Sequence, residues 1–169
     1  MTLDFDSFSL RAFRSADAPS MVRYANNRNV SRNLRDGFPY PYGLDDAHRA
    51  LAKFENSPLV FCIDVGGEAV GGIGVHPLDD VYRRGAELGY WLAEPFWGRG
   101  IATRAVRAIT EHAFHQRADL VRIQAAVFSW NPASGRVLEK AGYEREGVLR
   151  QSVFKDGVLG DSILYAKLR

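Results

Sequence analysis

Hydrophobic and polar residues alternate along the first third of the chain in patterns that predict one strand and two short helices. Residues 7–13 alternate as a strand does, and Ser15 is the expected N-cap of a helix over residues 17–25. Residues 26–42 carry asparagines, arginines, prolines and aromatics, which predicts a loop or a broken helix able to wall a substrate pocket. A second helix is expected over residues 45–56, where apolar residues recur at helical spacing.

The middle of the chain predicts an antiparallel meander followed by the most regular helix. Residues 59–65 and 68–75 are β-rich runs joined by a Gly-Gly pair, which is typical of a tight hairpin. A third strand is expected over residues 86–92, after a loop. Residues 100–116 place their apolar side chains on one broad helical face, so a long amphipathic helix follows.

The last third predicts a strand, a helix and a closing hairpin. A strand is expected over residues 120–128, and a helix over 132–141 has Asn131 as its N-cap and a glycine just past its end. Two β-rich runs, residues 143–154 and 158–168, surround an Asp-Gly pair that suits a type I′ turn. The order of elements predicts an α/β protein with a mixed sheet and helices on its faces.

Composition narrows the protein class without naming a function. The chain has 169 residues, 46% hydrophobic and 25% charged, which predicts a single domain over 1–169 with a core and room for a cleft. One cysteine, Cys62, lies in an apolar run, so we expect a buried residue, no disulfide, no metal site and a cytoplasmic location. The net charge of +2 comes from scattered arginines, which suits a phosphate-rich ligand better than nucleic acid. No apolar run is long enough to predict a membrane span.

A glycine turn is the first feature that points to chemistry. Gly98 and Gly100 follow a predicted strand and open a predicted helix, where backbone N–H groups and the helix dipole attract a phosphate. Arg99 and Arg104 can add charge-assisted hydrogen bonds. Such a turn alone is also compatible with a tight structural connection. A dinucleotide fold fits poorly because Asp119 precedes the next strand instead of ending it.

Four stretches in the second half together form a more specific signal. They are Glu87-Leu88-Gly89-Tyr90-Trp91-Leu92, Trp97-Gly98-Arg99-Gly100-Ile101-Ala102-Thr103, Asn131-Pro132-x-Ser134 and Glu139-Lys140-Ala141-Gly142-Tyr143. In this order they resemble the GNAT N-acetyltransferase superfamily, and within it the ribosomal-protein N-terminal acetyltransferase branch. The resemblance implies a mostly antiparallel sheet of about seven strands, with helices on both faces. The fourth and fifth strands, residues 86–92 and 120–128, should splay apart around pantetheine.

The resemblance also implies the activity and the donor-binding residues. The chain is expected to transfer an acetyl group from acetyl-CoA to a primary amine, either a protein N-terminus or a small molecule. Trp97 stands where the superfamily signature has Gln or Arg, which should matter little because the phosphate contacts come mainly from backbone amides. The implied cofactor-binding residues are Leu92, Trp97, Gly98, Arg99, Gly100, Ile101, Ala102, Thr103, Asn131 and Ser134.

Amide formation from a thioester requires a neutral amine and a proton for the departing thiolate. By resemblance, Ser134 would supply that proton and Asn131 would contact the pantetheine arm. Glu87 is the best candidate base, although a strand-end Glu is also commonly an ion-pair partner. Some relatives carry a Glu where this chain has Val153, so a water chain is an alternative base.

Three further residues have competing interpretations. His76 has a suitable ordinary pKa, yet a His-Pro pair before a loop is typical of a strand end. Tyr143 fits core packing better than proton transfer. Asp161 could face the acceptor amine or stabilise a turn.

Two other functions compete with catalysis. One is a non-catalytic acyl-CoA sensor, motivated by Val153, and the other is a ferredoxin-like nucleic-acid module, which lacks the interleaved aromatic and basic residues that it needs. Neither the acceptor nor the oligomeric state follows from the sequence, and a homodimer stays open.

Overall fold

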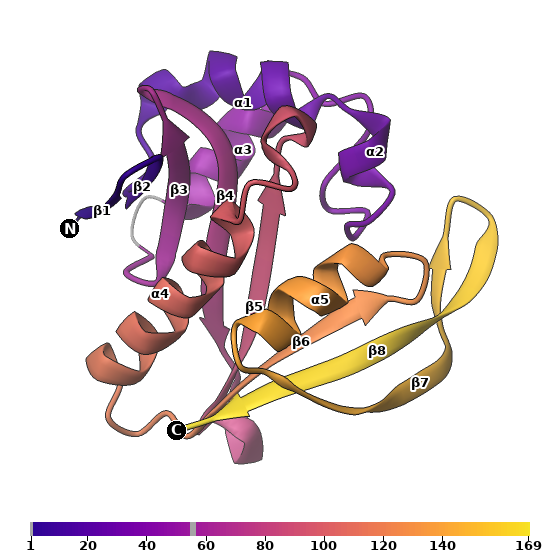
Figure 1. Ribbon diagram of the computed structural model, residues 1–169. Coiled ribbons are helices and arrows are strands. Elements are labelled where there is room, and N and C mark those ends of the chain that lie inside the picture. Colours follow the sequence, from indigo (N-terminus) through magenta and orange to yellow (C-terminus); the bar gives the residue numbers. More distant parts are fainter. Residues whose placement is uncertain (1, 55–56) are drawn as a thin grey trace. The chain divides into compact units, whose positions relative to one another are not determined.

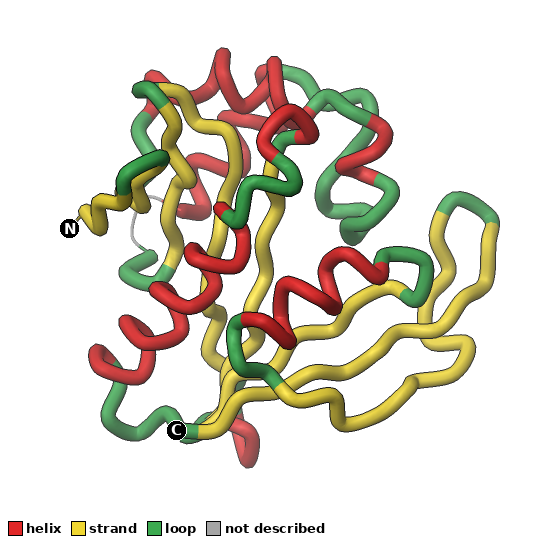
Figure 2. The backbone as a smooth tube through the Cα atoms, viewed as in Figure 1, coloured by secondary structure: helices red, strands yellow, loops and turns green. Residues whose placement is uncertain are grey.

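The computed structural model describes residues 2–54 and 57–169 (Figures 1 and 2). Its strands are β1 (Thr2–Phe5), β2 (Phe8–Arg11), β3 (Val60–Val65), β4 (Glu68–Pro77), β5 (Gly85–Leu92), β6 (Arg122–Phe128), β7 (Glu144–Lys155) and β8 (Val158–Leu168). Its α-helices are α1 (Ala18–Ala25), α2 (Arg28–Ser31), α3 (Leu44–Phe54), α4 (Ile101–Gln116) and α5 (Pro132–Lys140). The strands form one mostly antiparallel sheet in the order β1-β2-β3-β4-β5-β6-β8-β7.

The chain divides into two compact units, which are described separately. The first contains the chain up to Gly74 together with Tyr90–Ala105, and the second contains Val75–Gly89 and Val106–Arg169. Strands β4 and β5 and helix α4 each contribute residues to both units.

The first unit is a run of antiparallel strands with α1 and α3 packed together beside it (Figure 1). The predicted hairpin of β3 and β4 around the Gly-Gly turn is confirmed. Buried residues of α1 and α3, among them Met21 and Ala47, pack with Cys62 of β3 in one hydrophobic cluster. The helix expected over residues 45–56 is α3, which begins at Leu44, and the last two residues of that prediction lie outside the described part.

The sheet has one strand more than expected. A single strand was predicted over residues 7–13, whereas the structure has β2 there and an additional strand, β1, paired with it from Thr2↔Arg11 to Phe5↔Phe8. The residues of β1 are half-buried or exposed and include an aspartate, so their pattern carries no strand signal. Pairing with β2, and not local propensity, makes this edge segment a strand.

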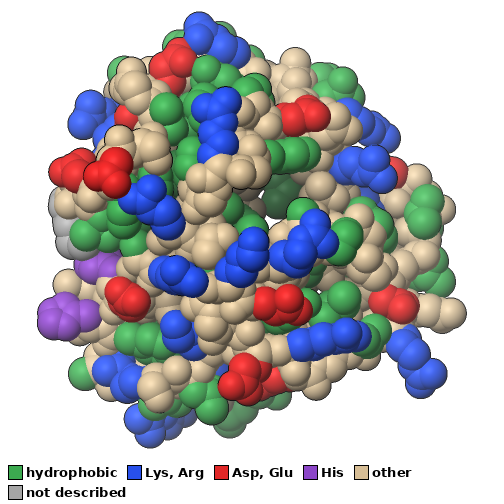
Figure 3. Space-filling view, in the orientation of Figure 1, with side chains coloured by type: hydrophobic (Ala, Val, Ile, Leu, Met, Phe, Trp, Pro, Cys, Tyr) green, Lys and Arg blue, Asp and Glu red, His purple; other side chains and the backbone are tan. Residues whose placement is uncertain are grey.

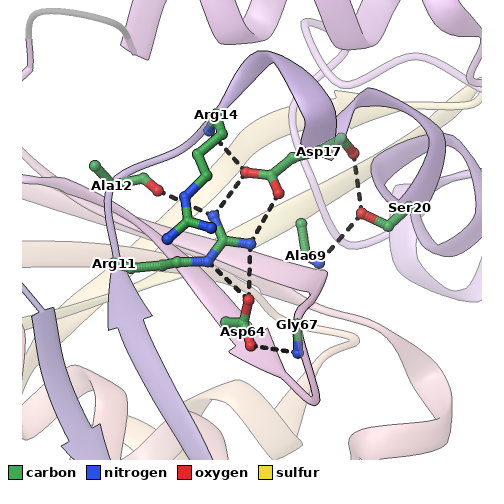
Figure 4. Close-up of polar contacts among 8 residues, drawn as sticks. All are labelled: Arg11, Ala12, Arg14, Asp17, Ser20, Asp64, Gly67 and Ala69. Atoms are coloured by element: carbon green, nitrogen blue, oxygen red, sulfur yellow. Dashed lines mark hydrogen bonds and ion pairs between the residues drawn. The ribbon is translucent and has the colours of Figure 1, made fainter.

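A buried ion network joins the start of α1 to β2 and β3 (Figure 4). Arg11 is 5% exposed, and its guanidinium donates to both oxygens of Asp17, each at 2.8 Å, and to Oδ2 of Asp64 at 2.7 Å. Asp17 Oδ2 also accepts the N–H of Arg14 at 2.8 Å, and Asp64 Oδ1 accepts that of Gly67 at 2.8 Å. The network therefore ties the hairpin turn, β2 and the helix entry into one arrangement.

The predicted N-cap role of Ser15 is wrong. A 3-10 helix, Ser15–Asp17, precedes α1, and its N-cap position is Arg14. The capping acceptor is the Asp17 carboxylate, which binds the Arg14 N–H from three residues further along the chain. A carboxylate that is already drawn in by Arg11 is the stronger acceptor, so Ser15 is not needed for this role.

The second unit pairs β5 with β6 in parallel and β6, β8 and β7 in antiparallel fashion. Figure 1 shows α5 lying along β6 and β8. The helix ends as predicted: Gly142, at φ +89°, donates to Glu139 O at 3.0 Å, and Tyr143 donates to Leu138 O at 3.0 Å. These two bonds satisfy carbonyls of the last turn.

The closing hairpin is confirmed, but its strands are less regular than the pattern suggested. Asp156 and Gly157 have φ of +51° and +80°, as a type I′ turn requires. Strand β7 departs from regular pairing between Arg145 and Gly147 and again between Leu149 and Val153. In the second irregularity three β7 residues face a single β8 residue, so the strand bulges outward there.

Removal of one carboxylate from the buried network should destabilise the protein strongly. In Asp17→Ala the Arg11 charge loses one of its two buried partners, and we expect a loss of about 3 kcal/mol in the free energy of unfolding, measured by urea denaturation. Asp119→Ala is the matched control, because Asp119 forms an exposed ion pair with Arg117 at 2.9 Å. A similar loss in both variants would contradict the role of burial.

The same variant should respond differently to acid. Burial alone would raise the pKa of Asp17, but hydrogen bonds from the Arg11 guanidinium and the Arg14 N–H outweigh it and lower the pKa below its ordinary value. The unfolded chain therefore takes up this proton first, so the contribution of Asp17 is complete above about pH 4 and is lost as pH falls through the lowered pKa. Asp17→Ala should accordingly lose less stability than the wild type upon acidification below about pH 4.

Candidate active site

The glycine turn leads directly into α4 in the first unit. Gly98 and Gly100 have φ of +73° and +75°, a left-handed conformation that favours glycine. A Cβ atom at either position would meet nothing within 4 Å, so space is open in front of the turn. The backbone N–H of Arg104 donates to Gly100 O at 3.1 Å. The N–H groups of residues 101–103 precede this bond and have no acceptor four residues back within the helix.

The two arginines beside the turn differ in what holds them. The Arg99 guanidinium lies 5.3 Å from the ring centre of Phe96, and Arg99 is exposed. The Arg104 guanidinium lies 5.1 Å and 5.3 Å from the ring centres of Phe5 and Phe8, which stack on each other. The aromatic rings of β1 and β2 therefore hold the Arg104 guanidinium, whereas the Arg99 guanidinium contacts Phe96, just before the turn.

The connection from β5 to the turn is held at several points. Leu92 is buried at the end of β5, and its carbonyl oxygen accepts the indole N–H of Trp97 at 2.7 Å. The N–H of Ala93 donates to Val70 O on β4 at 2.8 Å. A 3-10 helix, Glu94–Phe96, lies between these contacts. The predicted donor residues from Leu92 to Thr103 thus form one continuous, well-connected segment.

Residues 26–42 form a short helix followed by an aromatic loop, as the loop or broken-helix prediction allowed. The carboxylate of Glu94 accepts the side-chain N–H groups of Asn27 at 2.7 Å and of Asn29 at 3.0 Å. The Phe38 ring lies 5.3 Å from that of Trp91, centre to centre. Within the first unit, this loop is therefore attached to the connection that leads to the glycine turn.

In the second unit, Asn131 and Ser134 lie at the start of α5. Asn131 occupies the N-cap position, as predicted, but among the described residues its side chain makes no capping hydrogen bond. The first turn is formed by Pro132 and by the N–H of Ser134, which donates to Asn131 O at 3.2 Å. The side-chain amide of Asn131 is therefore not engaged by the first N–H groups of α5.

Glu87 is half-buried on β5, opposite Gln124 of β6 in the parallel pairing. The paired residues are Gly85–Glu87 and Arg122–Gln124, although β5 runs on to Leu92 and β6 to Phe128. Both strands thus continue past their paired segment, as the predicted splay requires. A half-buried carboxylate at this point is chemically able to accept a proton.

The structure assigns structural positions to two of the other candidates. Tyr143 is 3% exposed, and its hydroxyl lies 2.7 Å from Thr110 Oγ1, so it belongs to the core as expected. Asp161 Oδ1 accepts the N–H of Gln151 at 2.7 Å, which stabilises the bulge of β7. His76 is exposed at the end of β4.

The bulge also creates a feature that the sequence pattern did not predict. An open depression of about 810 Å³ is lined by Val148, Leu149, Arg150, Gln151 and Asp161. Its shape depends on Gln151, whose φ is +53°. A left-handed glutamine has no local sequence signal, because the residues that commonly adopt this conformation are Gly, Asn and Asp.

Other kinds of site find little support. Within the described ranges, no group of three or more His, Cys, Asp or Glu side chains is placed to hold a metal ion. Cys62 is buried, and burial raises the pKa of its thiol to about 12, so it is unsuited to nucleophilic chemistry. On the face shown in Figure 3, basic and acidic side chains are interspersed. None of the helices in the described part of the chain has the length and apolar character to span a bilayer.

Comparison with known proteins places these features in a family. The model of the acetyltransferase (GNAT) domain matches residues 8–144. The uncharacterized N-acetyltransferase YoaA of Bacillus subtilis is 38% identical over 177 residues, which cover 97% of this chain and 94% of that protein. The ribosomal-protein-serine acetyltransferase of Escherichia coli is 32% identical over 109 residues, covering 64% of this chain and 60% of that protein.

A solved structure has the same fold. Mycobacterium smegmatis RimJ, in complex with CoA-disulfide, superposes with a TM-score of 0.80 at 27% identity, covering 95% of this chain and 81% of that one. The chain belongs to the GNAT acetyltransferase family. It is an N-acetyltransferase that uses acetyl-CoA to acetylate an amine, as the motifs predicted, and nothing in these comparisons supports the non-catalytic sensor.

Proposed function

We propose that this acetyltransferase modifies the N-terminal amine of a protein and binds the pyrophosphate of acetyl-CoA at the turn from Trp97 to Thr103. The observation that carries the donor site is the left-handed pair Gly98 and Gly100 at the start of α4. The pair leads into a helix of 16 residues, and a Cβ added at either glycine would meet nothing within 4 Å. Backbone N–H groups and the positive end of the helix dipole are well suited to two adjacent phosphates.

Asn131, Ser134 and Glu87 receive the remaining roles in the proposal. The amide of Asn131, which makes no capping hydrogen bond among the described residues, would bind the pantetheine arm, and the Ser134 hydroxyl would donate a proton to the sulfur. As the amine nitrogen forms its bond to the acetyl carbon, the C–S bond breaks and the thiolate takes the Ser134 proton. Glu87, or water beside it, accepts the proton that the amine loses, and solvent restores both side chains.

The neutral fraction of the attacking amine favours a protein N-terminus as the acceptor. The attacking amine must be neutral, and a protein α-amino group, with an ordinary pKa near 8, is about one-tenth neutral at pH 7. An alkyl amine with a pKa near 10.4 is neutral in fewer than about one molecule in a thousand. An N-terminal amine therefore needs no strong base, which suits a chain with Val153 where some relatives carry Glu.

The loop of residues 26–42 also disfavours a polycationic acceptor. It contains three arginines, Arg28, Arg32 and Arg35, against one aspartate. This excess of positive charge in the loop sequence disfavours a polyamine more than it disfavours a peptide with a single amine. The relationship to a ribosomal-protein-serine acetyltransferase supports the same acceptor class. A cytoplasmic location, suggested by the single buried cysteine, stays a prediction.

A carboxylate in the turn should abolish donor binding. Gly100→Asp places a negative charge against the proposed pyrophosphate site, and calorimetry with CoA should detect no binding at concentrations that saturate the wild type. Gly66→Asp is the matched control, because Gly66 has a similar φ of +63° and equally open surroundings in a hairpin turn. Wild-type affinity in Gly100→Asp would show that the donor binds elsewhere.

Loss of the Ser134 hydroxyl should slow the chemical step. We expect Ser134→Ala to lower kcat about 100-fold while the KM for acetyl-CoA changes little, because proton donation matters only as the thiolate leaves. Ser57→Ala, which removes an exposed hydroxyl bound to Lys53 O, serves as the control. An unchanged kcat would remove Ser134 from the mechanism.

The acceptor class can be tested by thiol release with a panel of amines. Peptides with free N-termini should release CoA, whereas N-acetylated versions of the same peptides and spermidine should give background rates. Mass spectrometry should place the added acetyl group on the α-amine. Efficient turnover of spermidine, with none of peptides, would overturn the proposed acceptor and leave the donor site standing.

A further inference from the structure

The indole of Trp97 makes a contact across the proposed donor site that a phenyl ring cannot reproduce. Its Nε1–H donates to the carbonyl oxygen of Leu92 at 2.7 Å, spanning five residues of the chain. Leu92 is the last residue of β5, and Trp97 immediately precedes Gly98. The bond therefore joins the end of a strand to the first residue of the glycine turn.

The segment between these residues is already well ordered. The N–H of Ala93 is bonded to β4 through Val70 O at 2.8 Å, and the backbone N–H of Trp97 donates to Glu94 O at 3.1 Å. The Trp97 side chain adds a third fixed point at the end of the segment. Beyond Trp97, by contrast, the chain passes through two glycines that flank an exposed arginine before α4 begins.

Glycine has more accessible backbone conformations than any other residue. A turn with two glycines therefore loses more conformational entropy when a ligand binds. Fixing the residue before such a turn reduces the number of those conformations in the free protein. A site that is ordered in advance binds more tightly, since less entropy is lost upon binding. The Trp97 side chain is uncharged and its single donor is engaged by Leu92, so it cannot supply charge to a phosphate.

From this geometry we propose that Trp97 is a positioning residue for the donor: its indole N–H holds the glycine turn in the conformation that binds the pyrophosphate. This inference rests on the proposed binding of CoA at the turn. It differs from the sequence-based expectation that a Trp at this position should matter little, because it gives the side chain an indirect role on the turn.

Two substitutions separate the hydrogen bond from the bulk of the ring. Trp97→Phe removes the N–H and part of the ring, whereas incorporation of β-(3-benzothienyl)alanine at position 97 replaces only the N–H by sulfur. We expect both variants to bind CoA about five- to tenfold more weakly in calorimetry, which corresponds to loss of one hydrogen bond. At saturating acetyl-CoA their kcat should match that of the wild type, so the effect appears in KM alone.

Hydrogen exchange supplies a readout that does not depend on activity. In the free protein, the amides of residues 98–101 should exchange faster in both variants than in the wild type. Tyr82→Phe is the control, since Tyr82 is a 70% exposed aromatic residue in the 3-10 helix Asp80–Tyr82. It should change neither CoA affinity nor exchange at the turn.

The outcomes distinguish this inference from the proposed function. If the wild type does not bind CoA, or if Gly100→Asp binds it normally, the donor site itself is wrong. If the wild type binds CoA and both Trp97 variants bind it equally well, Trp97 has no positioning role. If Trp97→Phe binds weakly but the benzothienyl variant binds normally, ring packing and not the hydrogen bond is responsible, and the inference is overturned.

Discussion

The left-handed backbone at Gly98 and Gly100 is the constraint on which the proposed donor site depends. It turns the chain from the end of β5 into α4, and a Cβ added at either glycine would meet nothing within 4 Å. An L-amino acid with a Cβ would find this conformation strained at two positions within three residues. The two glycines also allow the turn many conformations. The hydrogen bond from Trp97 to Leu92, at the end of β5, restricts them.

The rest of the first unit gives this turn a stable base. Strand β4 holds the N–H of Ala93, and the buried Arg11 network fixes the hairpin that begins β4. A charge as deeply buried as that of Arg11 is tolerated only because two carboxylates surround it, and removing either leaves a costly imbalance. The network thus contributes to the arrangement of the unit more than to its net stability.

The second unit provides the proposed chemical groups through helix and strand ends. Asn131 is the N-cap residue of α5 without a side-chain capping bond, and the N–H of Ser134 donates instead to the backbone oxygen of Asn131. The bulge in β7 places Gln151 over Asp161, so that a carboxylate considered for the acceptor is engaged by backbone instead. In both places the backbone hydrogen bonds determine which side chains are left for function.

The amino-acid sequence alone determined the elements whose geometry is set by residues close together along the chain. The hairpin of β3 and β4, the type I′ turn at Asp156, the end of α5 at Gly142 and the glycine turn before α4 all follow from residues with strong conformational preferences. The GNAT family likewise follows from motifs at short range. These features are readable because neighbouring residues alone set their geometry.

Only the tertiary structure decided the features whose partners lie far apart along the chain. Strand β1 exists because β2 pairs with it, Asp17 replaces Ser15 at the helix entry because Arg11 draws in its carboxylate, and Gln151 is left-handed because Asp161 accepts its N–H. Trp97 departs from the family signature in the sequence, but only the folded chain brings its indole N–H to Leu92 O. In each case a contact from another element outweighs the local preference, and a pattern of neighbouring residues does not record such contacts.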